Sequence, residues 1–195
     1  MIEPPCPAWL SFTLTNVFRR IIHNPVRILG PFLREGDTAI DIGCGPGFFT
    51  VPMARLVGER GLVVAVDVQA KMLDLTRRRA ERAGVADRVR LHLAGRSRLA
   101  LDVRADFALA FWMAHEVEGL EDFFREIRTA LEPDGALLLV EPKVHVSDRR
   151  YAEIVAAAES AGFEPRETAP VRLSRAVRLC PGPRPRNRRA GDTGS

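Results

Sequence analysis

Residues 41–50 read DIGCGPGFFT and stand between an apolar run and a helical pattern. This order predicts a strand, a glycine turn and a helix start. The glycines Gly43, Gly45 and Gly47 suit a chain that turns sharply and brings its backbone against a ligand, because a Cβ at these positions would block both. The stretch therefore predicts a small-molecule binding site where a strand ends.

Two aspartates indicate which kind of ligand the site takes. Asp41 lies two residues before Gly43, where it would repel a pyrophosphate and attract an ammonium group. Asp67 ends a second apolar run, GLVVAVD at 61–67, and stands where an acid accepts both hydroxyls of a ribose. A ligand with an adenosine and an amino acid part fits both acids. A nicotinamide dehydrogenase is disfavoured by Asp41 and by the glycine spacing, which is G-x-G-x-G and not G-x-G-x-x-G.

From residue 37 onward, short β-rich runs alternate with helical stretches, which is typical of a parallel sheet covered on both faces. The expected strands are 37–42, 61–67, 88–94, 106–111 and 134–141, followed by two closing strands at 163–169 and 171–180. The expected helices are 47–58, 69–83, 119–131 and 148–161, the last capped by Ser147 and closed by Gly162. The pattern predicts an α/β fold.

Four segments follow one another in an order that is specific to one family. They are the loop at 41–50, Asp67, DFALAFW at 106–112 and LEPDGALLLVEP at 131–142. Over about residues 25–180 the chain resembles the class I S-adenosylmethionine-dependent methyltransferases, especially the group with the ubiquinone and menaquinone C-methyltransferases. The resemblance implies a Rossmann-like seven-stranded sheet, mostly parallel with an antiparallel last strand and helices on both faces. It also implies S-adenosylmethionine as the cofactor.

The expected cofactor contacts come from the strand ends. The unpaired N–H groups of a helix that begins after Gly47 would stabilise the cofactor carboxylate, Asp41 would take its amino group, and Asp67 would bind the ribose diol. By family position, Val68 and Met72 flank the adenine and Phe111 contacts the cofactor. The predicted cofactor-binding set is Asp41, Gly43, Cys44, Gly45, Gly47, Asp67, Val68, Met72, Gly95, Arg96 and Phe111. Cys44 is expected as a small residue in a tight turn and not as a reactive thiol.

The segment after the third expected strand departs from the family. Relatives usually carry an acid there that meets the adenine amino group, whereas this chain reads LAGRSR at 93–98. Backbone groups around Gly95 and Arg96, or the Ser97 hydroxyl, are the remaining candidates for contacts to the base.

The predicted catalytic residues are His115 and Glu116, which follow the fourth expected strand at the edge where the transferred methyl group would lie. The pKa range of histidine suits removal of a substrate proton. Many methyl transfers need no strong base, because alignment supplies much of the rate, so a role outside catalysis stays open for both. Three further pocket candidates follow the fifth strand: Glu141, Lys143 and His145.

Composition favours one globular domain, since the 195 residues are 46% hydrophobic. Of the formal net charge of +4, residues 181–195 carry +3 from four arginines and one aspartate, so the rest is nearly neutral. We expect an N-terminal helical lid segment at 1–36, an S-adenosylmethionine-binding methyltransferase domain at 37–180 and a disordered basic tail at 181–195. The apolar residues of the first segment are also compatible with a helix packed into the core.

The cysteines at 6, 44 and 180 show neither a metal-ligand spacing nor a disulfide framework, which predicts no metal site and a reducing, cytoplasmic setting. No apolar run is long enough to predict membrane insertion. We expect a small-molecule substrate and no nucleic-acid partner, and the composition is compatible with a homo-oligomer.

The sequence thus predicts an enzyme that transfers the methyl group of S-adenosylmethionine to a small organic acceptor. Two alternatives stay open. One is an RNA methyltransferase aided by the arginines at 184–189. The other is a non-catalytic S-adenosylmethionine-binding regulatory protein, which the missing acid after the third strand suggests.

Overall fold

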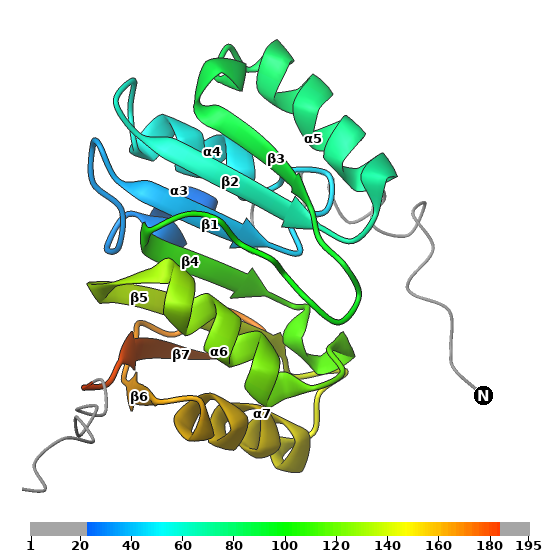
Figure 1. Cartoon of the computed structure of the whole chain (residues 1–195), viewed down its shortest axis with the longest axis vertical. Coiled ribbons are helices and arrows are strands. Elements are labelled where there is room, and N and C mark those ends of the chain that lie inside the picture. The colour runs from blue at the N-terminus through cyan, green and yellow to red at the C-terminus, as the bar shows by residue number, and fades with distance from the viewer. Residues whose placement is uncertain (1–22, 184–195) are drawn as a thin grey trace, which may run out of the picture.

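The apolar runs of the sequence form the strands of one sheet in the computed structural model, which describes residues 23–183 (Figure 1). The seven strands are β1 (Thr38–Ile42), β2 (Leu62–Asp67), β3 (Val89–Leu93), β4 (Ala105–Phe111), β5 (Leu131–Pro142), β6 (Phe163–Arg166) and β7 (Ser174–Pro181). Their order is β3-β2-β1-β4-β5-β7-β6, and β7 runs antiparallel to both of its neighbours. The predicted seven-stranded, mostly parallel sheet with an antiparallel last strand is confirmed.

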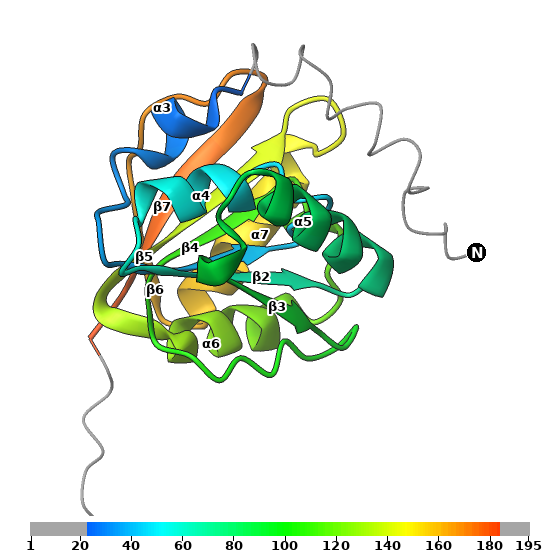
Figure 2. The same cartoon turned by 90° about the horizontal axis from the view of Figure 1, so that it is seen from above.

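Helices cover both faces of this sheet (Figure 2). They are α3 (Pro25–Leu29), α4 (Thr50–Leu56), α5 (Ala70–Arg82), α6 (Leu120–Ala130) and α7 (Asp148–Ser160), with short 3-10 turns η1 (Ala86–Arg88) and η2 (Ala114–Glu116). Figure 2 shows α4 and α5 on one side of the strands and α6 on the other. The N-cap of α7 is Ser147, as predicted, whose hydroxyl accepts a hydrogen bond from the Arg150 amide at 3.1 Å.

Because side chains alternate across a strand, each central strand contributes to two cores. Ile40 and Ile42 of β1 pack into the core that α6 and α7 cover, together with Phe124 and Ile154. Ala39 of the same strand faces the opposite core, which α3 and α4 cover. The strand is therefore buried on both faces, which is why it reads as a nearly continuous apolar run.

Some boundaries differ from the prediction. The helix expected at 47–58 is shorter and begins only at Thr50, because the preceding chain has positive φ angles at alternating glycines and continues as turns. The strand expected at 134–141 begins earlier, because Leu131 already pairs with Ala105 before an irregularity in the register. The closing strands expected at 163–169 and 171–180 are both shorter at the loop between them.

Two predicted segments extend beyond the residues that the structure describes. The expected lid segment lies outside the described residues at 1–22, and the expected tail at 184–195. The start of the expected tail, in contrast, belongs to the fold, since Pro181 pairs with Phe163 and the Gly182 amide donates to the Gly162 carbonyl at 2.9 Å. Between residues 23 and 183, no helix combines the length and the apolar character that a bilayer span requires.

Candidate cofactor site and active site

The glycine loop after β1 is tied to the end of β2. The amides of Gly43 and Cys44 both donate to the Val66 carbonyl, at 2.9 and 3.0 Å. Gly43, Gly45 and Gly47 have φ angles of 69°, 52° and 76°, in the left-handed region that favours glycine. A Cβ at Gly45 would meet no atom within 4 Å, so this residue borders open space. The loop therefore exposes its backbone at the carboxyl edge of the sheet, toward which the arrowheads of β1, β2 and β4 point in Figure 1.

Each of the other two glycines of this loop lies against a side chain. A Cβ at Gly43 would lie 3.0 Å from Cγ of Met113, which comes from the turn after β4. A Cβ at Gly47 would lie 3.0 Å from the Thr76 hydroxyl oxygen on α5. The same hydroxyl donates to the Gly45 carbonyl at 2.8 Å. The loop is thus held between α5 and the turn that carries the predicted catalytic residues.

Asp67 lies beside the loop with both carboxylate oxygens anchored by backbone amides. Its Oδ2 accepts from Gly45 N and its Oδ1 accepts from Gln69 N, each at 2.9 Å. Burial is the main influence on this carboxyl and raises its pKa, against the lowering effect of the amides. Each oxygen of an ionised carboxylate accepts more than one hydrogen bond. Asp67 therefore fits a ligand that offers two neighbouring hydroxyls.

Asp41 is more deeply enclosed than the sequence suggests. Its Oδ2 accepts a 2.6 Å hydrogen bond from the hydroxyl of Thr50, the first residue of α4. Asp41 and Asp67 both lie close enough to the Cys44 thiol to raise its pKa, although burial contributes more. The pKa of Cys44 is far above its ordinary value, so the thiol stays protonated and is a weak nucleophile.

The predicted adenine contacts gather around Asp67. The Ala94 amide donates to the Asp67 carbonyl at 3.0 Å, which holds the loop after β3 beside the end of β2. In that loop Gly95 and Arg96 are exposed, and the Gly95 amide donates to the Arg98 carbonyl. Val68, just before α5, is half exposed, whereas Met72 in the first turn of α5 is buried. Four of the expected adenine contacts, Val68, Met72, Gly95 and Arg96, thus lie on the two segments that follow β2 and β3.

The turn after β4 begins with a strained residue. Trp112 has φ 59°, a left-handed conformation that costs a non-glycine residue on the order of 1–3 kcal/mol. Its backbone amide donates to the Val140 carbonyl at 2.8 Å and its indole N–H donates to the Ser174 hydroxyl at 3.0 Å. His23 packs edge-on against the rings of both Trp112 and Phe111. These contacts hold the chain in the turn that places Met113 on the glycine loop.

The same turn brings His115 to a buried carboxylate at the end of β5. His115 Nδ1 lies 2.5 Å from Glu141 Oε2, and the other carboxylate oxygen, Oε1, accepts from the Ala114 amide at 2.9 Å. Glu141 is 0% exposed, whereas 22% of the His115 side chain is exposed. The hydrogen bond to Glu141 raises the pKa of His115. Glu116 is largely exposed, and its Oε1 lies 3.9 Å from His115 Nε2.

Of the three further pocket candidates, Glu141 belongs to the end of β5 and joins this cluster, whereas Lys143 and His145 lie exposed in the following loop. Sequence reasoning did not find the roles of Thr50 and Thr76, or the pairing of His115 with Glu141. Thr76 is fully buried on a face of α5 that it shares with apolar residues. A hydroxyl that recurs at the helical spacing of apolar residues was the feature of the sequence that could have indicated its role.

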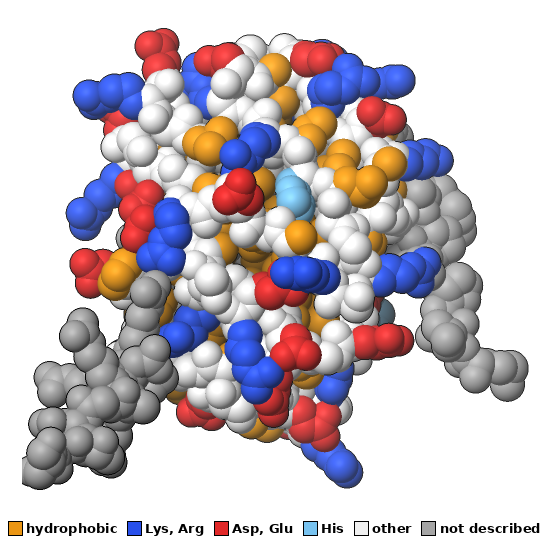
Figure 3. Space-filling view, viewed as in Figure 1, with side chains coloured by type: hydrophobic (Ala, Val, Ile, Leu, Met, Phe, Trp, Pro, Cys, Tyr) orange, Lys and Arg blue, Asp and Glu red, His pale blue; other side chains and the backbone are white. Residues whose placement is uncertain are grey.

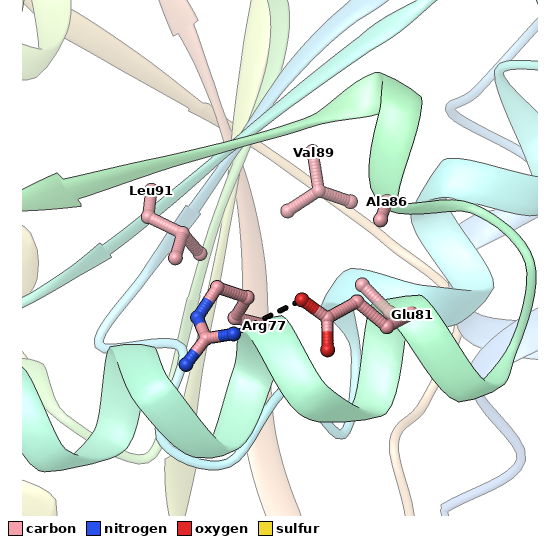
Figure 4. Close-up of a pocket in the computed structure, with 6 residues that line it drawn as sticks. Arg77, Glu81, Ala86, Val89 and Leu91 are labelled. Atoms are coloured by element: carbon pink, nitrogen blue, oxygen red, sulfur yellow. Dashed lines mark hydrogen bonds and ion pairs between the residues drawn. The ribbon is translucent and has the colours of Figure 1, made fainter.

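Away from this edge, the groove between α5 and β3 has a volume of about 260 Å³ (Figure 4). It is lined by Arg77, Ala80, Glu81, Ala86, Val89 and Leu91. An ion pair at 3.0 Å joins Arg77 and Glu81 there. None of the predicted site residues lines the groove. Figure 3 shows acidic and basic side chains interspersed over the face in view. Within 23–183, no three His, Cys, Asp or Glu side chains are grouped to hold a metal ion.

Comparison with known proteins gives a consistent result. Residues 39–135 match the family described as "Methyltransferase domain". A ubiquinone/menaquinone biosynthesis C-methyltransferase, UbiE, of Azotobacter vinelandii is 34% identical over 110 residues, which are 56% of this chain and 44% of that protein. A probable cobalt-precorrin-6B C(15)-methyltransferase (decarboxylating) of Saccharolobus solfataricus is 44% identical over 57 residues, 29% of each chain. The chain thus spans less than half the length of these curated relatives.

The fold also matches solved structures. A SAM-dependent methyltransferase from Aquifex aeolicus superposes with a TM-score of 0.79 at 24% identity, covering 89% of this chain and 98% of that one. At this identity the likeness shows the fold.

Proposed function

Because the chain belongs to the class I S-adenosylmethionine-dependent methyltransferases, we propose that it binds S-adenosylmethionine and transfers its methyl group to a small organic acceptor. The observation that carries this proposal is the anchored carboxylate of Asp67 beside the left-handed glycine loop. A ribose diol requires two acceptor oxygens in a fixed orientation, and the amides of Gly45 and Gln69 provide that orientation.

The other cofactor contacts are assigned on the same basis. Gly45 borders open space, so the loop can accept the amino acid part of the ligand, with Asp41 near its ammonium group. Val68 and Met72, with the backbone at Gly95 and Arg96, would enclose the adenine. Phe111 ends β4 on the side of the loop and would contact the cofactor near its sulfur. S-adenosylmethionine supplies an activated methyl group on a sulfonium.

The catalytic candidates are His115 and Glu116, next to the turn that contacts the glycine loop. Of the two, His115 has the stronger support, because its ring is partly buried and held by Glu141. Glu116 is exposed and would act only through its charge.

Calorimetric titration with S-adenosylhomocysteine tests the cofactor assignment. We expect Asp67→Ala to weaken binding by roughly a hundredfold, since losing about 3 kcal/mol of charge-assisted hydrogen bonding has that effect. Asp74→Ala is the matched control, because Asp74 is an exposed acid on α5 whose partner is Arg77.

Thermal unfolding of each variant separates a lost contact from a lost fold. If the wild-type protein bound NADH and not S-adenosylhomocysteine, or if both Asp variants lost affinity equally, the proposal would be wrong.

A further inference from the structure

Glu141 and His115 form a buried pair at the active-site edge, and cofactor binding alone does not require such a pair. An ionised carboxylate with no exposure is costly unless it is paired and hydrogen-bonded. Glu141 has both kinds of partner: the Ala114 amide on Oε1 and the His115 ring on Oε2. The fold therefore holds a charge in its interior at a position where its main effect is on one imidazole.

This pairing determines which nitrogen of His115 carries the proton. An ionised carboxylate only accepts hydrogen bonds, so Nδ1 must be the donor to Glu141. In the neutral imidazole the lone pair is then on Nε2, the nitrogen on the other side of the ring. Because 22% of the His115 side chain is exposed, the ring is not fully enclosed by the protein.

The position of His115 relative to the cofactor loop follows from its neighbours in sequence. Met113, two residues earlier, packs on Gly43, where a Cβ would lie 3.0 Å from Met113 Cγ. Glu141 follows Val140, which pairs with Phe111 at the end of β4. The short turn from 112 to 115 therefore spans from the glycine loop to the imidazole.

Building on the proposed function, we propose that His115 is a general base, that Glu141 is its positioning residue, and that the acceptor carries an acidic hydroxyl group, such as a phenol. The choice of acceptor follows from acidity. A thiol, with a pKa near 8.5, ionises in part without help, and an aromatic amine is neutral near pH 7 and already has a free lone pair. A phenol, with a pKa of about 10, is within reach of an imidazole. An alcohol that is as weakly acidic as water is not.

The charges around His115 come from three elements. Glu141 on β5 and Glu116 on η2 raise its pKa, while Arg150 on α7 lowers it. Tyr151 of α7 is half-buried, and the Arg175 guanidinium lies 5.9 Å from the centre of its ring. Since the net effect is a raised pKa, the neutral base is fully available only above that pKa, and the rate should rise with pH through it.

Nε2 of neutral His115 takes the hydroxyl proton, and the imidazolium that forms is stabilised by Glu141. The electron pair left on oxygen forms the new C–O bond to the methyl carbon as the C–S bond breaks with its pair on sulfur, which yields S-adenosylhomocysteine and the methyl ether. The proton on Nε2 then passes to water.

Glu141→Gln tests the positioning role, because only one orientation of the Gln amide satisfies the backbone N–H of Ala114. The Ala114 amide requires an acceptor, so the Gln oxygen must stay there and the Gln NH2 must face His115 Nδ1. Nδ1 then becomes the acceptor and the proton moves to Nε2, where the base should be. Histidine 15N chemical shifts report the tautomer without turnover: we expect an Nδ1–H tautomer in the wild type and an Nε2–H tautomer in the variant.

Activity is measured with catechol, benzyl alcohol, aniline and benzyl mercaptan as separate probes. We expect catechol to be methylated in preference to the other three, and Glu141→Gln to lower kcat by about a hundredfold or more and to remove its rise with pH. Glu159→Gln is the matched control, an exposed acid on α7. His115→Asn serves if Glu141→Gln fails to fold, because its amide still donates to Glu141 but offers no base.

Binding of S-adenosylhomocysteine, measured on every variant, separates the two proposals. If the wild type fails to bind it, the proposed function fails. If it binds, the inference about His115 is overturned by an Nε2–H tautomer in the wild type, by preference for the thiol or the amine, by failure to methylate catechol, or by a kcat that His115→Asn leaves unchanged.

Discussion

Three buried carboxylates line the site, and the partner of each sets what it can do. Asp41 accepts from the Thr50 hydroxyl, and Asp67 accepts from two backbone amides. Both are therefore oriented acceptors for a ligand that brings its own donors. Glu141 pairs instead with the ionisable ring of His115. It can therefore set the tautomer of an imidazole and favour its charged form.

The stability of the protein should also depend on pH through His115. The hydrogen bond to Glu141 raises the folded-state pKa above the 6.5 of an unperturbed histidine. The resulting stabilisation is complete below the unfolded pKa and is lost as pH rises through the folded one. Thermal unfolding measured over a series of pH values, starting below the unfolded pKa and rising from there, follows this loss. We expect a smaller loss in His115→Asn; an equal loss would show that another group is responsible.

Two short connecting segments determine the site: the glycine loop after β1 and the turn after β4. The loop is fixed by Thr76 of α5, and the turn is fixed by the hydrogen bonds of Trp112 to β5 and to the start of β7. The two segments meet at Gly43 and Met113. A change in either segment should therefore alter both cofactor binding and the position of His115.

Gly47→Ala tests the loop, with Gly84→Ala as its control. Both glycines have positive φ, at 76° and 68°, so alanine pays a similar backbone cost of about 1–2 kcal/mol at each. At Gly84 a Cβ meets nothing within 4 Å, whereas at Gly47 it lies 3.0 Å from the Thr76 hydroxyl. Urea unfolding should show a larger loss of stability for Gly47→Ala, and only this variant should bind S-adenosylhomocysteine more weakly. Equal effects would mean that the contact with Thr76 is unimportant.

For the whole molecule, the sheet order places the ends of β1, β2, β4 and β5 at one edge. This arrangement brings residues from four separate stretches of sequence into one site. Hydrogen bonds within the folded domain extend as far as Gly182, whose carbonyl accepts one from Arg128 at 2.9 Å.

Truncation after Pro183 should therefore leave the melting temperature and the affinity for S-adenosylhomocysteine unchanged. It removes a net charge of +3, so it also tests the RNA methyltransferase alternative. If that alternative held, the full chain would bind RNA with a steep salt dependence that the truncated protein lacks. Gel-shift titration of both proteins at two salt concentrations makes the comparison, and salt-dependent RNA binding by the full chain alone would favour the alternative.

The sequence by itself determined the sheet, the order of helices and strands, and the acids at the ends of β1 and β2. These features are local: an apolar run buried on both faces forms a strand, and glycines at alternate positions form a loop with positive φ. The predicted boundaries of helices and strands were wrong where tertiary pairing extended or shortened an element. At Leu131, for example, the strand begins earlier than predicted because this residue pairs with Ala105.

Only the tertiary structure decided which chemical groups meet. His115 and Glu141 are 26 residues apart, and nothing in the period of either segment indicates that they touch. The left-handed backbone of Trp112 is likewise fixed by partners on other strands. The physical reason is that local periodicity sets which face a side chain occupies, whereas the lateral order of the strands and the turns between them set which side chains on that face come within hydrogen-bonding distance.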